Sequence, residues 1–188
     1  MDSLTMSDGN KFEIIAPFSE NRGISLLLKY NKIHILNKCC TSAIFDCLSL
    51  MCIKNSRIPV IIERRDGIRN VIDCLRFHKD EYHLVYRVLQ VAKYLATNKS
   101  NLAKFSLSGT FLPVLHGILE KFGDARGPDF FILLCQLCES LAFHNPTRRN
   151  MQNMKFVDTI HGKRSTFKDN RDCVRAVKIC ISQVASLV

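Results

Sequence analysis

The residues in this sequence with the clearest chemical potential are two closely spaced thiols. Cys135 and Cys138 form a C-x-x-C pair, the spacing with which cysteines bind zinc or carry out dithiol exchange. A structural zinc site usually needs a second such pair, and the sequence has none. A thioredoxin-type pair follows a strand, whereas this one lies inside the apolar run FFILLCQLCESLAF. We therefore expect both thiols to pack in a core without a metal.

The remaining cysteines give the same indication. The chain contains nine cysteines, an odd number, and its first residues lack the basic and apolar segments of a secretory signal. Cys39, Cys40, Cys47 and Cys52 fall on one predicted helix. We expect a reducing, cytoplasmic location in which the thiols act as small core residues.

Other catalytic patterns are missing from the sequence. Among six histidines, only His78 lies one helical turn from a possible co-ligand, Cys74, and two ligands do not make a metal site. Nucleophile elbows, Walker loops and dinucleotide-binding glycine patterns do not occur either. The sequence predicts no enzyme, no cofactor and no metal.

Basic charge is the strongest remaining signal. Twenty-seven Lys and Arg face 17 Asp and Glu, which gives a formal net charge of +10 and favours an acidic partner. Nine of the basic residues lie between Arg148 and Lys178, against three acids. The alternative is an ordinary solvated surface. The predicted binding residues are Arg148, Arg149, Lys155, Lys163 and Arg164, with Arg69 and Arg76 in a second cluster.

An internal repeat determines which elements would position these side chains. Ile24, Ile68, Phe111 and Phe156 each open an apolar segment, at intervals of 44, 43 and 45 residues. The residues three and four positions further on, the spacing of one helix face, are Leu27/Leu28, Val71/Ile72, Val114/Leu115 and Thr159/Ile160. A period near 44 is typical of armadillo and HEAT repeats.

A second family of helices precedes the later three segments. VYRVLQVAKYLATN and ILLCQLCESLAFHN match at an offset of 46, which aligns Gln90 with Gln136 and Leu95 with Leu141. Polar turns that begin at Asn55, Asn98 and Asn145 follow these helices. The sequence predicts an all-α fold, a short right-handed armadillo/HEAT-like superhelix of about four units with incomplete ends. An ordinary helical bundle without repeats is the alternative.

The whole chain, 1–188, is predicted to be a single repeat domain. Residues 1–12 are expected to be flexible, and 161–170, which are charged and lack an apolar stripe, are expected to form a loop. Residues 171–188 show apolar positions every three to four residues and predict one closing helix. No apolar run reaches the roughly 18 to 20 residues that a membrane-spanning helix needs.

The order of these segments resembles the extreme C-terminal region of the abnormal spindle proteins, the microcephaly-associated spindle-pole family. The similar segments run from VYRVLQVAKYLATN and FLPVLHGILEKF to the closing DCVRAVKICISQVASLV, and the resemblance covers roughly residues 40–188. It implies a helical-repeat module of a protein that organises microtubule minus ends at spindle poles in mitosis. The calponin-homology domains and IQ repeats of that family do not occur in this sequence.

These observations lead to two functional hypotheses. The first is a non-enzymatic protein-interaction scaffold whose groove and basic surface hold an acidic protein segment or a microtubule-associated assembly, without a membrane. The second is a helical-repeat domain that uses the same charge to bind nucleic acid. The resemblance places the first at the spindle pole or centrosome.

Overall fold

The computed structural model describes residues 23–186, which fold into α-helices joined by short connections, with no strand among them. Three kinds of helix recur in chain order. The short helices are α4 (Ile58–Arg64), α7 (Lys99–Leu107) and α10 (Asn145–Asn153). The middle helices are α2 (Gly23–Ile33), α5 (Gly67–His78), α8 (Phe111–Phe122) and α11 (Phe156–Arg164). The long helices are α3 (Lys38–Lys54), α6 (Tyr82–Ala96), α9 (Pro128–Ala142) and α12 (Arg171–Ala185).

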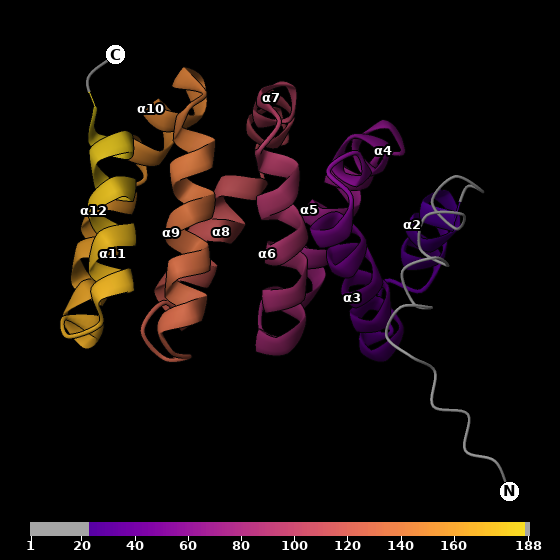
Figure 1. Ribbon diagram of the computed structural model, residues 1–188, viewed down its shortest axis with the longest axis horizontal. Helices are drawn as coiled ribbons and strands as arrows, with labels where there is room; N and C mark the ends of the chain where they lie inside the picture. The colour runs from indigo at the N-terminus through magenta and orange to yellow at the C-terminus, as the bar shows by residue number, and fades with distance from the viewer. Residues whose placement is uncertain (1–22, 187–188) are drawn as a thin grey trace, which may run out of the picture.

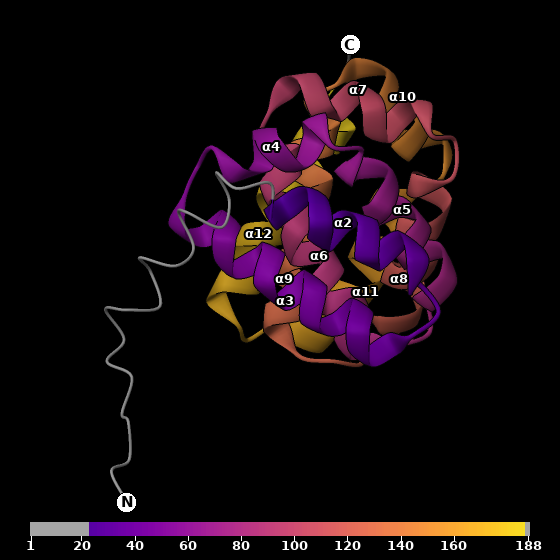
Figure 2. The same cartoon turned by 90° about the vertical axis from the view of Figure 1, so that its right-hand side faces the viewer.

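The helices form a row rather than a bundle around one axis. The long helices lie side by side in chain order, with the short helices along one edge (Figure 1). Along the row, α3 contacts α6, α6 contacts α9, and α9 contacts α12. In the view along the row, the middle helices lie beside the long ones (Figure 2). The long helices therefore present a common face that crosses successive units.

Short helices occupy the positions where the sequence predicted only polar turns. The side chain of Asn98 accepts a hydrogen bond from the backbone N–H of Ser100 at 3.1 Å and so caps α7. Pro59 and Pro146 lie in the first turns of α4 and α10, where a missing N–H costs nothing. Asn and Pro at these positions thus end one helix and begin the next.

Each short helix leads into a middle helix through a residue in the left-handed conformation. Asp66 (φ 62°) precedes α5, Gly109 (φ 65°) precedes α8 and Lys155 (φ 59°) precedes α11. The same backbone turn thus recurs at the same place in three successive units.

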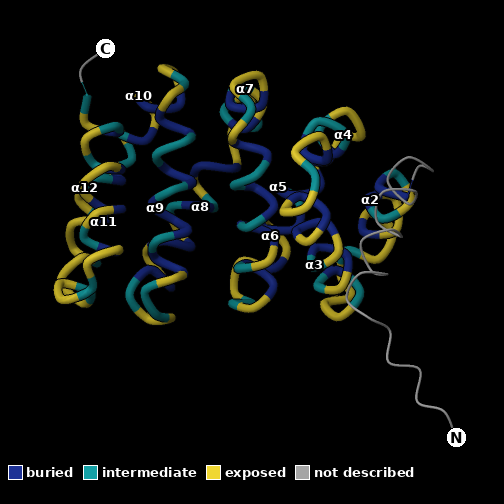
Figure 3. Tube along the Cα trace, in the orientation of Figure 1, coloured by how far each residue is buried: buried dark blue, intermediate teal, exposed yellow. Residues whose placement is uncertain are grey.

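The residues that the sequence alignment matched between units are buried. Ile24, Phe111 and Phe156 are fully buried, and Ile68 is 5% exposed. The matched residues Leu95 and Leu141 are both fully buried. Buried and exposed segments alternate along the helices of the row (Figure 3). One continuous apolar cluster runs from Ile24 to Val184. The prediction of an all-α fold is confirmed.

Two predictions about the C-terminal third are wrong. The predicted loop 161–170 is shorter, because His161 to Arg164 complete α11 and Ser165–Phe167 form a 3₁₀ turn. Charged residues occupy the last turn of α11 because that turn is exposed. Phe167 in the 3₁₀ turn packs on Phe131, with ring centroids 5.4 Å apart. The last unit is also complete, with α10, α11 and α12, whereas the first described unit has only α2 and α3. The predicted flexible segment 1–12 lies outside the described residues.

Polar contacts join each unit to the next at a recurring place. Near the end of a middle helix, a side chain reaches the segment that follows the preceding middle helix. His78 Nε2 bonds the carbonyl of Ile35, Lys121 bonds Asp80, and Lys163 bonds Asp124 at 2.9 Å. The partners are separated by 43, 41 and 39 residues. The repeat seen in the sequence is therefore also a repeat of contacts between neighbouring units.

Within the described residues, no single helix is long and apolar enough to span a membrane. Only α7 and α8 taken together have the required length and composition, and they are bent by 89° relative to each other.

Gly67 and Gly117 provide a matched test of this packing. A Cβ at Gly67 would lie 2.2 Å from Ile62 Cγ2 and 2.5 Å from the carbonyl oxygen of Ile62, whereas a Cβ at Gly117 would meet nothing within 4 Å. We expect Gly67→Ala to lower the free energy of unfolding by about 1–3 kcal/mol, because α4 must move away from α5. Gly117→Ala should raise it by up to about 1 kcal/mol through helix propensity. Urea unfolding followed by circular dichroism measures both, and equal effects of the two substitutions would contradict the packing.

Candidate interaction surfaces

The clearest groove on the long-helix face lies between α3, α6 and α9. It has a volume of about 190 Å³. The lining residues come from three successive units: Ser49, Ile53, Tyr86, Gln90, Lys93, Tyr94, Asp129, Ile132, Leu133 and Gln136. We call this surface the long-helix groove. It contains three aliphatic residues beside amides and phenols. Lys93 is its one base and Asp129 its one acid, so the groove has no net charge.

Side chains in this groove present hydrogen-bonding groups at regular positions. Gln90 and Gln136, which the sequence aligned at an offset of 46, both line it. Lys93 Nζ donates a hydrogen bond to Gln136 Oε1 at 2.6 Å, which fixes that amide and leaves its Nε2 as a donor. Within residues 23–186, the amide of Gln90 and the hydroxyls of Tyr86 and Tyr94 have no hydrogen-bond partner. The groove therefore offers donors and acceptors beside apolar contact area.

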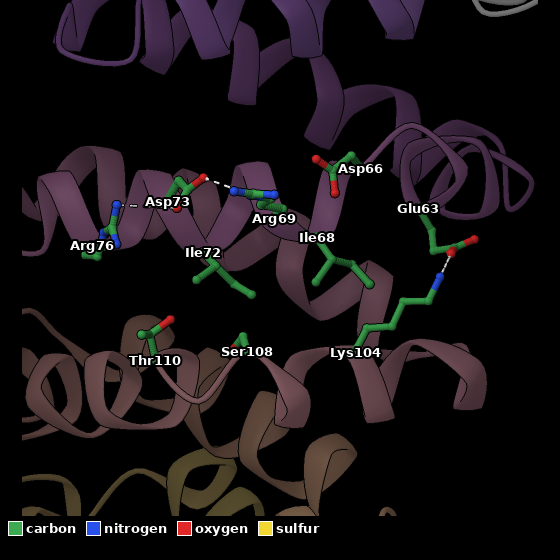
Figure 4. Close-up of a pocket in the computed structure, with 10 residues that line it drawn as sticks. All are labelled: Glu63, Asp66, Ile68, Arg69, Ile72, Asp73, Arg76, Lys104, Ser108 and Thr110. Atoms are coloured by element: carbon green, nitrogen blue, oxygen red, sulfur yellow. Dashed lines mark hydrogen bonds and ion pairs between the residues drawn. The ribbon is translucent and has the colours of Figure 1, made fainter.

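A larger cleft, of about 420 Å³, lies between α5 and the α7–α8 corner (Figure 4). The predicted binding residues Arg69 and Arg76 line it and stand on either side of Asp73, at 3.8 Å and 3.7 Å. Lys104 pairs with Glu63 across the cleft. Asp66 adds a third acid to these three bases. Arg69 and Arg76 thus belong to a charge-balanced cleft. The carboxylate of Asp73 neutralises part of the positive charge that the sequence predicted there.

The structure does not bring the other five predicted residues together. Arg149, Lys155 and Arg164 are exposed and have no ion pair with any residue of the described chain. Lys155 precedes α11 and Arg164 is its last residue, which places their backbones about 13 Å apart. Lys163 is only half-exposed and is paired with Asp124. Three separate cations, rather than one dense patch, remain on this part of the surface.

The prediction that Arg148 is displayed on the surface is wrong. Arg148 is 9% exposed, and its guanidinium donates hydrogen bonds to Asn145 Oδ1 at 2.8 Å and Ser186 Oγ at 2.9 Å. It therefore ties α10 to the residue that follows α12. Its role is structural, and the contacts that bury it come from a segment 38 residues away.

The thiols at the α9–α12 seam confirm the prediction that the C-x-x-C pair packs in a core. Cys135, Cys138 and Cys180 are all fully buried. Interaction with the Cys180 thiol, together with burial, raises the pKa of Cys135 and Cys138. No group of three His, Cys, Asp or Glu side chains in the described residues has the geometry to hold a metal ion.

Three of the six histidines act as structural hydrogen-bonding groups. His78, the predicted one-turn neighbour of Cys74, is buried and bonds the carbonyl of Ile35. His116 bonds Thr159 Oγ1 at 2.9 Å, and His144 bonds Thr147 Oγ1 at 2.8 Å. His116 Nδ1 also lies 3.8 Å from Glu120 Oε1, one turn further along α8.

Sequence reasoning did not identify the long-helix groove, although one signal pointed to it. The match of Gln90 with Gln136 was used only to align the units. Polar residues that recur at the same position of successive apolar helices also indicate a row of exposed positions that crosses those helices. Tyr86, Lys93 and Ile132 could not be assigned to the groove, because the pairing of α3 with α6 and α9 is needed to bring them together.

Comparisons of the chain with protein-family models, with curated proteins and with solved structures found no match. The function is therefore argued from the geometry of the surfaces.

The thiols give a direct check on the described burial. Cys39 and Cys47 are exposed, whereas burial raises the pKa of Cys52 and Cys74 to about 12 and keeps them as neutral thiols. We expect N-ethylmaleimide near neutral pH to modify Cys39 and Cys47 quickly and the buried cysteines only after unfolding, as peptide mass mapping would show. The same reaction in urea, where all nine cysteines should react, is the control. Rapid modification of Cys52 or Cys180 in the folded chain would contradict this arrangement.

Proposed function

We propose that the chain is a non-enzymatic protein-interaction scaffold of armadillo- or HEAT-like repeats, and that its long-helix groove binds an extended segment of a partner protein. The observation that carries this proposal is the pair of amides, Gln90 and Gln136, at the same register of two neighbouring long helices. Beside them lie apolar and aromatic side chains that a peptide could contact.

The recurrence of short, middle and long helices supports the repeat assignment. In such proteins each unit contacts only its neighbours, and stacking produces an elongated binding surface. The polar contacts at separations of 39 to 43 residues follow that pattern. So does the left-handed turn that precedes each of α5, α8 and α11.

The dimensions of the groove suit an extended peptide. Neighbouring packed helices lie about 8–10 Å apart, and an extended chain advances about 10 Å in three residues. An amide carries both donors and an acceptor, so Gln90 and Gln136 could each bond the backbone of the peptide at every third residue. Ile53, Tyr86 and Ile132 would then contact its side chains.

Nucleic-acid binding is the second candidate, because Arg149, Lys155 and Arg164 are exposed without ion pairs to described residues. Phosphate contacts would make binding to RNA or DNA fall steeply with salt concentration. Parallel measurements on RNA and on microtubules at matched salt separate this candidate from a protein partner. The resemblance to abnormal spindle proteins suggests the spindle pole as the place where such a scaffold would act.

The groove can be tested without knowledge of the natural partner. Peptides selected from a random phage-displayed library against the full chain should bind it, and Tyr86→Ala/Gln90→Ala/Gln136→Ala should weaken that binding about tenfold or more, a loss of about 1.4 kcal/mol. Isothermal titration calorimetry on the selected peptides gives the dissociation constants.

Leu107→Ala is the matched control, because Leu107 is 84% exposed at the end of α7 and lies outside the groove. It should bind the peptides like the wild type. Selected peptides that bind the triple variant and the wild type equally, while both keep the same helicity, would show that the groove is not the binding site.

A further inference from the structure

The first described helix, α2, carries an apolar stripe that faces away from the other described helices. Leu26, Tyr30 and Ile33 are 53%, 56% and 63% exposed. Their spacing of four and three residues places them on one side of the helix. Figure 2 looks onto this end of the row, where α2 and α3 lie foremost. Three large apolar side chains on one helix face are more than a scattered surface distribution.

The molecule itself shows what covers the corresponding face of the next middle helix. Residues 44 positions later, Asn70 and Cys74 on α5, correspond to Leu26 and Tyr30. They are 7% and 0% exposed, and Asn70 accepts a hydrogen bond from Asn31 of α2 at 2.9 Å. On α5, the part of this face that carries Asn70 and Cys74 is therefore buried with α2 packed beside it, whereas Phe77, which corresponds to Ile33, is 50% exposed. Leu26 and Tyr30 occupy on α2 the positions that are buried on α5.

The charge beside the stripe restricts the partner. Lys29 and Lys32 lie on the side of the stripe that borders a cleft of about 240 Å³ between α2 and α5. Arg65 lines the same cleft, and Asp66 is the single acid in its lining. The sequence of α2, GISLLLKYNKI, contains no acidic residue. A second copy packed α2 against α2 would bring like charges together, whereas an acidic partner would be attracted.

We propose that this end surface, formed by Leu26, Tyr30 and Ile33 with Lys29, Lys32 and Arg65, binds an amphipathic helix of an acidic partner protein. Apolar side chains of the helix pack on the stripe, as α2 packs on α5. Aspartate or glutamate residues along one border of the helix face Lys29, Lys32 and Arg65. The surface is separate from the long-helix groove, so the proposal does not depend on peptide binding there.

The test uses the full chain and a fluorescent synthetic helix of about 18 residues, long enough to form a helix in isolation. One peptide has leucines along one face and glutamates beside them, and a second has lysines in place of the glutamates. Fluorescence anisotropy should show binding of the acidic peptide and little binding of the basic one. Leu26→Asp/Tyr30→Asp should weaken binding of the acidic peptide about tenfold or more.

Charge reversal separates the electrostatic part from the apolar part. Lys29→Glu/Lys32→Glu should weaken binding of the acidic peptide, most strongly at low salt, and should strengthen binding of the basic peptide. Leu107→Asp, which also places a charge at an exposed leucine, should leave both unchanged. The groove variant Tyr86→Ala/Gln90→Ala/Gln136→Ala should bind the acidic helix normally, which distinguishes failure here from failure of the groove proposal.

Three results would overturn the proposal. The first is that both peptides bind equally well or that neither binds. The second is an equal loss in the Leu107→Asp control. The third is a dimer, seen by light scattering, that Leu26→Asp/Tyr30→Asp dissociates, because the stripe would then be the contact between two copies.

Discussion

The structure depends on one constraint: a single unit of short, middle and long helix cannot bury its own apolar surface. Long helix α6 shows this most clearly, because Val85, Leu89 and Leu95 are fully buried while the helix contacts both α3 and α9. Burial of apolar surface between neighbouring units supplies the stabilisation, and the polar contacts at His78, Lys121 and Lys163 fix the offset between units. Stability, register and surface pattern therefore all follow from contacts between neighbours.

This constraint also explains why the surfaces differ along the row. On α5, Asn70 and Cys74 are buried, and Asn70 accepts a hydrogen bond from Asn31 of α2. At the α2 end, the same face carries the exposed stripe. At the other end, α12 exposes Arg171, Arg175 and Lys178 along its solvent side. The long helices, by contrast, share a common face, where side chains at one register from successive units line a single groove.

Much of this arrangement could be predicted from apolar spacing. The period near 44 located the middle helices, and the match of Leu95 with Leu141 placed both residues in the core. The C-x-x-C pair was assigned to the core because it lies in a helical apolar run. The partial neutralisation of Arg69 and Arg76 by Asp73 could also have been read from their spacing of four and three residues.

Other features depend on contacts that sequence spacing does not contain. Arg148 is buried by Asn145 and by Ser186, a residue from a different segment. The short helices have seven to nine residues, too few for a clear apolar period, so only their Asn and Pro residues were recognised, as turns. Identification of the groove required the side-by-side placement of α3, α6 and α9. The α2 stripe could be distinguished from a core stripe only by its exposure.

The central claim is that each unit is stabilised by its neighbours rather than by one common core, and hydrogen exchange tests it most directly. Phe156 is fully buried in the last unit, so Phe156→Ala should destabilise that unit by about 3–5 kcal/mol. Exchange followed by mass spectrometry should then rise strongly in α10, α11 and α12, less in α9, and little in α3 to α5. An equal rise in every helix would show one cooperative core and would contradict the account.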